Sequence, residues 1–364
     1  MKRRDVLIGG GAVAVAAAGA TYMTVARMGS TADYDEMAAA TRATLPQRPE
    51  TRDLIRYATL APNGHNAQPW LFRASENRID ILPDFARRTP VVDPDDHHLY
   101  ISLGCAAENL ALASAARGQP GALAYDPAAN GSIGFDFSAG AAVPSALFDA
   151  IPKRQSTRAD YDGRPVGVAD LGLLAAAAAI PGVDLILITD RPQIGRVRDL
   201  VVAGNDAQMA DPAFMRELKS WLRFNPHRAA ETGDGLYSAA SGSPAMPDWL
   251  GPRAFDWFVT AKSENDRYAA QLNSSSGVAV FVGAKEDRAH WVLVGRACQR
   301  FALQATALGL KHAFVNQPVE VPALRPELAA LVGMTGRRPD IVMRFGNGLD
   351  LPFSARRPTR FVSA

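Results

Sequence analysis

Two stretches of the chain share one pattern of apolar positions. The segments "DHHLYISLGCAAENLALASAARG" from Asp96 and "DRAHWVLVGRACQRFALQATALG" from Asp287 align without a gap. In each, apolar residues recur at the spacing of one helix face, and a glycine, Gly118 or Gly309, ends the pattern. The pattern predicts two long buried helices, one in each half of the chain.

Strand patterns flank both predicted helices in the same order. The apolar runs "RIDILPDF" at 78–85 and "GVAVFVGA" at 277–284 precede them, and "IGFDFSAG" from Ile133 and "IVMRFGNG" from Ile341 follow, each with a glycine turn. The repeated order indicates an internal duplication, with chance similarity between two alanine-rich helices as the alternative. We therefore expect an α+β fold, with central sheets flanked by helices and two tandem halves that form an intramolecular pseudo-dimer around a shared groove.

The amino terminus predicts an export signal. Lys2, Arg3 and Arg4 precede an uncharged run from Val6 to Ala26, and residues 18–20 are small, as cleavage requires. The paired arginines are typical of a twin-arginine signal. We expect a periplasmic or extracytoplasmic protein, or one anchored to the membrane by this segment alone if it stays uncleaved.

The same residues allow a second interpretation. Gly9, Gly11 and Ala14 fit the G-x-G-x-x-G/A fingerprint of a Rossmann dinucleotide site. A Rossmann helix needs a polar outer face, however, whereas residues 12–20 are alanine, valine and glycine throughout. The pattern favours the signal.

These patterns divide the chain into a signal or anchor (1–30), a polar spacer (31–50), a first half (51–147) and a second half (148–364). Within the second half, residues 212–260 form an inserted segment rich in Trp, Phe, Gly and Pro. Its aromatic residues predict either a lid over a binding site or simple packing of the insert onto the body. These residues are Trp221, Phe224, Trp249, Trp257 and Phe258.

Composition and charge exclude some classes of protein. The net charge is +2, from 39 basic and 37 acidic residues, so we expect no nucleic-acid partner. Cys105 and Cys298 lie far apart in sequence and are interpreted as buried apolar residues rather than as a disulfide. His97 and His98 are adjacent and cannot share one helix face, so no metal site is predicted.

One segment has the composition of an anion site. In "IPKRQSTRADYDGRPV", Arg154, Ser156 and Arg158 occupy alternate positions, which point to one side of an extended segment. Guanidinium groups bind phosphate through paired, charge-assisted hydrogen bonds. The segment predicts a phosphate site, with a solvated basic turn as the alternative.

Six motifs in order carry a family resemblance: "APNGHNAQPW", "RQSTR", "ALGL", "VNQPVE", "MRFGNG" and "SARRP". Together they resemble the flavin-binding nitroreductase superfamily. "GHNAQPW", "ISLGCAAENLALA" and "WLRFN...GDGL" are similar to the Acg-like branch of FMN-binding oxidoreductases. The resemblance covers nearly everything after residue 50.

The resemblance implies FMN as the cofactor and assigns its contacts. The amino-terminal flavin motif corresponds to Arg154, Ser156 and Arg158, and the phosphate-gripping basic pair to Arg356 and Arg357. The loop that reaches the flavin from the other half corresponds to Pro62, Asn63, Gly64, His65 and Asn66, although Asn63-Gly64-His65 replaces the usual small serines. The segment near flavin N5 corresponds to Val315, Asn316 and Gln317, where the family often has an acidic residue and a glycine. One complete set of contacts implies one FMN in a monomeric chain.

The resemblance also implies a function. It predicts an exported oxidoreductase that passes electrons from NAD(P)H or another donor, through FMN, to a small flat acceptor. No catalytic acid or nucleophile stands out in the sequence. A flavin-sequestering or storage protein with little turnover is the alternative, because a tight lid would block the donor.

Overall fold

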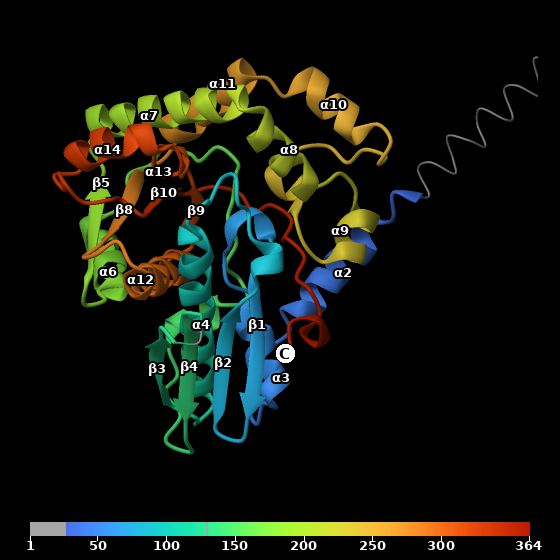
Figure 1. The fold of residues 1–364 in the computed structure, drawn as a ribbon, viewed down its shortest axis with the longest axis vertical. Coiled ribbons are helices and arrows are strands. Elements are labelled where there is room, and N and C mark those ends of the chain that lie inside the picture. Colours follow the sequence, from blue (N-terminus) through green and yellow to red (C-terminus); the bar gives the residue numbers. More distant parts are fainter. Residues whose placement is uncertain (1–26, 129) are drawn as a thin grey trace, which may run out of the picture.

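The computed structural model describes residues 27–128 and 130–364, which fold around two four-stranded antiparallel sheets (Figure 1). The first sheet has the order β1 (Trp70–Ser75), β2 (Arg78–Pro83), β4 (Ser132–Phe137) and β3 (Gly121–Asp126). The second has the order β5 (Val183–Ile188), β8 (Gly277–Gly283), β10 (Ile341–Gly346) and β9 (Lys311–Phe314). The predicted α+β fold with central sheets is confirmed.

Each sheet is built around one long helix. Helix α4 (His97–Ala116) connects β2 to β3, and α12 (Arg288–Ala307) connects β8 to β9 in the same way. The two sheets have the same strand order when β1 is matched with β5, β2 with β8, β4 with β10 and β3 with β9. The predicted helices and their flanking strands are confirmed, and the shared topology is the arrangement that the predicted duplication requires.

Helices α4 and α12 lie side by side at the centre of the molecule (Figure 1) and touch through two glycines. A Cβ at Gly104 would lie 2.2 Å from the carbonyl oxygen of Val292, and a Cβ at Gly295 would lie 2.0 Å from that of Ile101. Gly104 aligns with Gly295 in the repeat, and Ile101 aligns with Val292. The contact is therefore reciprocal, as across a two-fold axis.

Buried polar pairs extend this seam. Gln299 Nε2 donates to Asn109 Oδ1 at 2.6 Å. Glu108, which is almost fully buried, accepts from Arg296 Nε and Arg300 Nη1, both at 2.8 Å. These bonds satisfy polar groups that would otherwise be buried without partners, so they fix the register of the two helices.

The second sheet is covered on both faces. Along β8, Ala279 and Phe281 face the core that contains α12, while Val278, Val280 and Val282 face a second cluster. The covering elements on that second face are α7 (Arg191–Ala210), α11 (Ala261–Asn273) and α14 (Arg325–Leu331). Smaller helices complete the body, namely α3 (Thr51–Thr59) against α4, and α5 (Ala146–Ala150) and α6 (Val168–Ala178) against α12.

Helix α4 is long and apolar enough to cross a bilayer by length and composition, but 83% of that stretch is buried inside the protein. It is therefore a core helix. Cys105 and Cys298 are free and buried, as predicted. The predicted signal lies almost wholly in residues 1–26, outside the described residues.

The prediction of a polar spacer is wrong for residues 31–42. Helix α2 (Thr31–Thr41) packs against the insert, and Tyr34 and Ala38 are buried in a cluster with Tyr237 and Ala355. One apolar pair four residues apart is enough to dock the helix, although the segment as a whole is polar. We call residues 31–42 the strap.

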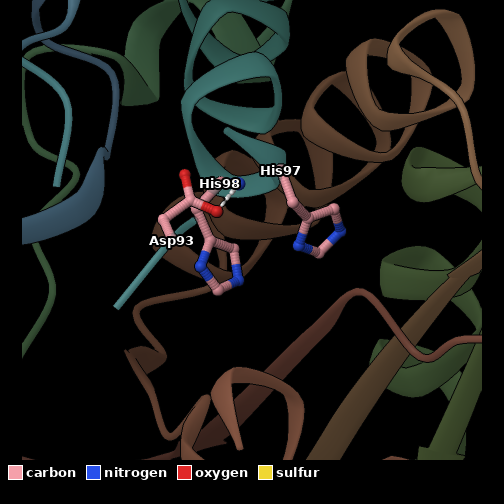
Figure 2. A group of neighbouring side chains, drawn as sticks. All are labelled: Asp93, His97 and His98. Carbon is pink, nitrogen blue, oxygen red and sulfur yellow. Dashed lines mark hydrogen bonds between the residues drawn. The ribbon is translucent and has the colours of Figure 1, made fainter. Parts of the chain in front are cut away.

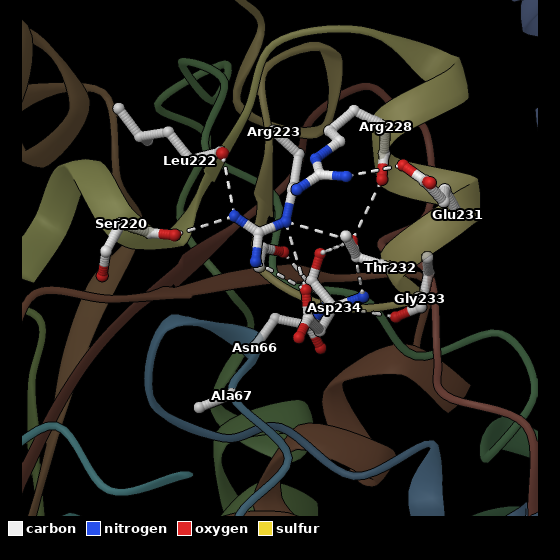
Figure 3. A network of polar contacts seen from close by, with 12 residues as sticks. Asn66, Ala67, Ser220, Leu222, Arg223, Arg228, Glu231, Thr232, Gly233 and Asp234 are labelled. Carbon is white, nitrogen blue, oxygen red and sulfur yellow. Dashed lines mark hydrogen bonds and ion pairs between the residues drawn. The ribbon is translucent and has the colours of Figure 1, made fainter. Parts of the chain in front are cut away.

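The insert (212–260) lies between the ends of α7 and α11 and the strap (Figure 1). It contains α8 (Pro212–Trp221), β6 (Leu222–Arg223), α9 (Pro226–Thr232), β7 (Leu236–Tyr237) and α10 (Gly251–Phe258). Figure 3 shows its main polar network, in which Asp234 accepts from Arg223 Nη2 at 2.7 Å. Asp234 also pairs with Arg87 of the first half, so this carboxylate ties the insert to the body.

Candidate functional site

A cavity of about 580 Å³ lies where the two halves and the insert meet. The first half contributes the loop Pro62–His65 and the residues His98, Ile101, Ser102 and Cys105 on α4. The second half contributes Arg158, residues from α7 and α11, and the segment from Phe314 to Glu320. No described element could form this cavity alone, so the predicted shared groove has a physical counterpart.

The loop before β1 is held in an unusual conformation. His65, Asn66 and Gln68 have φ values of 48°, 54° and 55°, which non-glycine residues rarely adopt. Such strain persists only where neighbouring groups impose it, and it clusters at functional sites. Here Asn63 Oδ1 accepts from the Gln68 backbone N–H at 2.7 Å, which closes the loop on itself.

The same loop is anchored from outside by the insert and by the carboxy-terminal segment that contains Ala355 and Arg357. Gln68 Nε2 donates to the Gly233 carbonyl at 2.8 Å, and the Arg357 N–H donates to Gln68 Oε1 at 2.9 Å. Asn66 Nδ2 donates to the carbonyls of Gly235 and Ala355. The loop is therefore rigid, and its Pro62–His65 face is presented to the cavity.

His65 and Arg158, from different halves, both line the cavity. Burial, and to a smaller extent the positive charge of Arg158, lower the pKa of His65 to about 4. His65 is thus neutral at pH 7 and offers hydrogen bonds without charge. Its Nδ1 has no hydrogen-bond partner among the described residues.

The segment after β9 brings two more predicted residues to the cavity. Asn316 Oδ1 accepts from the Val342 backbone N–H at 2.9 Å, which fixes that side chain. Gln317 begins the short helix α13 (Gln317–Glu320), and its buried Oε1 has no partner within the described chain. Val315 is fully buried behind them and does not line the cavity.

Other predicted site residues lie beside the cavity rather than on its wall. Arg154 and Arg356 are buried behind the loop, with exposed fractions of 3% and 7%. Asn66 bonds to Arg356 there, while Ser156 bridges to His312 and Arg357 pairs with Asp84. The predicted set therefore divides into a cavity group and a group behind the loop.

The group behind the loop includes an arginine that the sequence reasoning missed. Arg42 of the strap shares the Ser354 carbonyl with Arg356, and Arg154 shares the Leu60 carbonyl with Arg356. Within the described chain, no carboxylate pairs with any of these three guanidinium groups, which we call the arginine triad. Burial is the main cause that lowers the pKa of Arg42 to about 9 and of Arg154 to about 10, and the positive charge of Arg154 contributes to the lowering for Arg42.

The arginine triad adjoins the cavity through the loop backbone. The Ala61 carbonyl accepts from Arg356 Nη2 at 3.2 Å and from Asn63 Nδ2, on the cavity side, at 3.3 Å. Arg42 Nε and Arg154 Nε and Nη1 have no partner in the described part of the chain. Unpaired buried guanidinium groups of this kind fit an anion such as a phosphate.

A polar corner of the cavity also escaped the sequence analysis. Glu320 Oε2 accepts from Gln208 Nε2 at 2.7 Å, and its Oε1 lies 3.9 Å from His98 Nδ1. Burial raises the pKa of Glu320 and lowers that of His98. Burial therefore favours the neutral form of each group. No spacing signal marked this pair, because the two residues come from different halves.

Figure 2 shows Asp93, His97 and His98 at the start of α4, side chains of the kinds that bind metals, with ligand atoms within 4.8 Å of one another. Asp93 already accepts the backbone N–H groups of His98 and Leu99, both at 3.0 Å. His97 Nε2 lies 2.7 Å from Asp340 Oδ1. These bonds explain the cluster as a cap that ties α4 to the second sheet, and we assign it no metal.

The insert contributes aromatic side chains to the cavity, but not all those considered from sequence. Phe224 and Phe258 line it, together with Phe214 and Phe255. The three tryptophans do not: Trp249 and Trp257 are 60% and 65% exposed, and Trp221 packs on Arg87. Phenylalanine rings, rather than indoles, thus shape the insert's side of the cavity.

Comparisons with known proteins agree with the resemblance carried by the motifs. The chain is 26% identical over 334 residues to a Mycobacterium tuberculosis H37Rv protein named "Putative NAD(P)H nitroreductase Rv3131", covering 88% of this chain and 92% of that one. It is 24% identical over 330 residues to "Putative NAD(P)H nitroreductase acg" of the same strain, covering 86% and 96%. No family model matches the chain. The resemblance to Acg-like nitroreductases is confirmed.

Similarity to solved structures is weaker. The FMN-dependent nitroreductase NfnB of Mycobacterium smegmatis, solved with NADPH, is 11% identical with a TM-score of 0.37, over 56% of this chain and 87% of that chain. A nitroreductase of Desulfitobacterium hafniense with bound FMN is 15% identical with a TM-score of 0.38, over 59% and 96%.

Proposed function

We propose that this chain is an exported, nitroreductase-like oxidoreductase that binds one FMN between its two duplicated halves. It passes electrons from a nicotinamide or other donor to a small flat acceptor. The observation that carries this proposal is the cavity of about 580 Å³ formed by both halves beside three buried arginines that no carboxylate neutralises in the described chain. The relatives named as nitroreductases support the same class of reaction.

The residues present fit the two chemically different ends of FMN. Arg158 brings a guanidinium group to the cavity wall for the phosphate, and the arginine triad adds positive charge behind the loop. The cavity provides neutral hydrogen-bonding groups for the ring, namely His65 and the free Oε1 of Gln317. When bound, FMN would supply reversible hydride and electron chemistry.

The protein's own contribution is shape, charge and proton supply. Phe214 and Phe255 line the cavity with apolar rings, which favour a flat aromatic partner and exclude water. Arg158 provides positive charge, which would stabilise negative charge that develops on bound groups. Glu320 lies on the cavity wall, and burial raises its pKa, which favours a role as proton donor to a bound molecule.

A second function, flavin sequestration with little turnover, is favoured by one observation. The insert supplies lining residues from Phe214 to Val259, and the pairing of its Asp234 with Arg87 fastens it to the body. An insert held in this way would retain a flavin while it hinders the entry of a nicotinamide. The two functions share the site and differ only in access.

Anaerobic titration distinguishes these functions. The full chain, loaded with FMN, is mixed with NADPH or NADH under nitrogen, and the visible flavin band is followed. Bleaching that a quinone or nitroaromatic reverses supports the oxidoreductase. A band that persists with nicotinamides but bleaches with dithionite supports sequestration. A chain that cannot be loaded with FMN refutes both.

A further inference from the structure

We propose that the insert (212–260) docks on a membrane, and that three exposed aromatic side chains on it contact the headgroup region of a bilayer that contains anionic lipids. These side chains are Trp249, Trp257 and Phe258, and we call them the aromatic patch. The inference rests on the proposed function only for export, which would bring the chain to a membrane.

The aromatic patch leaves a large apolar surface open to solvent. Trp249 is 60% exposed, Trp257 is 65% exposed and Phe258 is 71% exposed. Because an aromatic side chain has about 150–250 Å² to bury, the three together expose roughly 300–500 Å². An exposed patch of this size on a single chain is often an interaction site.

A basic residue lies within the aromatic patch. Trp249, Arg253 and Trp257 follow one another at four-residue spacing, which places them on one side of α10 and the turn before it. Arg253 Nη1 donates to the Trp249 carbonyl, and no carboxylate of the described chain pairs with this guanidinium. Tryptophan concentrates at the headgroup level of a bilayer, where basic side chains meet lipid phosphates. The composition of the patch therefore fits an anionic bilayer surface.

The place where the amino-terminal segment joins the fold indicates a bilayer as the partner. This segment contains the uncharged run from Val6 to Ala26, which is near the length that spans a membrane. The Met28 carbonyl accepts from the His227 backbone N–H at 2.9 Å, and a Cβ at Gly29 would lie 3.0 Å from His227 Cβ. The segment therefore joins the body at α9 of the insert (Figure 1).

The aromatic patch is bonded to the same part of the insert. Asn225, two residues before His227, donates from Nδ2 to Asp248 Oδ1 at 2.7 Å and to the Met246 carbonyl at 3.2 Å. Asp248 directly precedes Trp249. One short stretch of the insert thus holds both the patch and the start of the described chain, so a bilayer that holds the amino-terminal segment would lie beside the patch.

The aromatic patch is continuous with the cavity. Phe258 belongs to the patch and also lines the cavity, and its neighbours Phe255 and Val259 line the cavity too. Docking of the patch would therefore place this side of the cavity at the bilayer surface.

Tryptophan emission tests the contact directly. The full chain is mixed with vesicles of phosphatidylcholine and phosphatidylglycerol, with or without bromine atoms high on the acyl chains, because bromine quenches a tryptophan that it touches. Two of the five tryptophans lie in the patch, whereas Trp70 and Trp291 are buried in the body. We expect bromine to remove up to about two fifths of the emission, and Trp249→Phe or Trp257→Phe to reduce this loss by about half.

A charge reversal within the patch keeps both tryptophans as reporters. Arg253→Glu should reduce the bromine-dependent loss several-fold, because it places a negative charge against anionic headgroups. Arg52→Glu is the matched control, since Arg52 is a 73% exposed arginine of the first half, and it should leave the loss unchanged. Arg253→Gln replaces the glutamate variant if that variant does not fold. Equal losses in the Arg253 and Arg52 variants would overturn the proposal.

Flotation of the vesicles shows whether the chain is bound. A chain that does not float, or one that floats in brominated lipid without loss of emission, would overturn the proposal. A dimer that Trp257→Ser dissociates, with no quenching by bromine, would overturn it as well and would assign the patch to a second copy of the chain.

The measurement needs no flavin, so it is independent of the proposed oxidoreductase. A chain that takes up no FMN but is quenched by bromine would refute the oxidoreductase and support the docking. A chain that takes up FMN but is not quenched would overturn the docking alone.

Discussion

The glycine contact between α4 and α12 gives a quantitative prediction. Alanine at position 295 would place its Cβ 2.0 Å from the Ile101 carbonyl oxygen and 3.0 Å from the Cys105 nitrogen. Both neighbours are backbone atoms of a buried helix, so no side-chain rotation can relieve the clash and the helices must separate. Overpacking of a core costs about 1–3 kcal/mol, occasionally more, and a backbone clash belongs at the upper end.

Helix propensity offsets part of this loss. Replacing glycine by alanine inside a helix contributes about 1 kcal/mol of stability. The net prediction for Gly295→Ala is therefore a loss of about 2 kcal/mol in the free energy of unfolding. Urea denaturation followed by circular dichroism measures it, and with a slope near 3 kcal/mol per molar the midpoint should fall by about 0.7 M.

Gly172 provides the matched control. It lies inside helix α6, and a Cβ there would meet nothing within 4 Å. Gly172→Ala should therefore show the propensity gain alone, a midpoint raised by about 0.3 M. Gly104 and Gly295 lie at the same contact, so the separation of the helices that relieves one clash also relieves part of the other. The double variant Gly104→Ala with Gly295→Ala should therefore lose less stability than the sum of the two single variants. A Gly295→Ala protein as stable as wild type would refute the close contact.

Two further predictions concern the insert and the pH dependence of stability. Asp234→Asn removes the charge that pairs with Arg87 and Arg223, whose side chains and that of Asp234 are only 10–19% exposed, so it should lower the free energy of unfolding by about 2–3 kcal/mol and speed hydrogen exchange in the insert. Asp256→Asn is the control, because the Asp256 side chain is 53% exposed and its loss should cost under about 0.5 kcal/mol. Equal costs for the two variants would contradict the role of the network. Burial lowers the pKa of His312 to about 3. Between about pH 6.5 and pH 3 the unfolded chain therefore binds a proton at this histidine that the folded chain does not. The free energy of unfolding should fall across this range as the pH is lowered, by up to about 1.4 kcal/mol per pH unit. Urea midpoints at pH 7 and 5 should therefore differ less in His312→Gln than in wild type, and equal differences would refute the assignment.

The sequence was sufficient for the central elements because their signals are local. The apolar runs at 78–85 and 277–284 became β2 and β8, and both predicted helices end near glycines with φ values of 75° and 76°. The reciprocal contact of Gly104 with Gly295 could not be read from the repeat alone. The alignment marks conserved spacing between the copies, but only the packed helices show that a Cβ has no room.

The site was predicted less completely, since much of it depends on residues distant in sequence. Pro62 to His65 and Arg158 reach one cavity, as the motifs indicated, but Arg154 and Arg356 lie behind the loop. Arg42 belongs to no motif and to no periodic pattern in the sequence. Only the structure shows that it lies beside Arg356, because both side chains donate to the Ser354 carbonyl. The Glu320 and His98 pair escaped notice for the same reason.

The symmetry of the fold and the asymmetry of the site have one physical explanation. Where α4 meets α12, backbone touches backbone, and any side chain at Gly104 or Gly295 would separate the halves, so both copies keep glycine. The cavity does not require the same residue in both halves. A single bound molecule needs only one loop and one set of cationic groups. The first half can therefore supply the strained loop around His65 while the second supplies Arg158 and Gln317. Under the proposed function, one set of contacts at one cavity predicts that loading saturates at one FMN per chain.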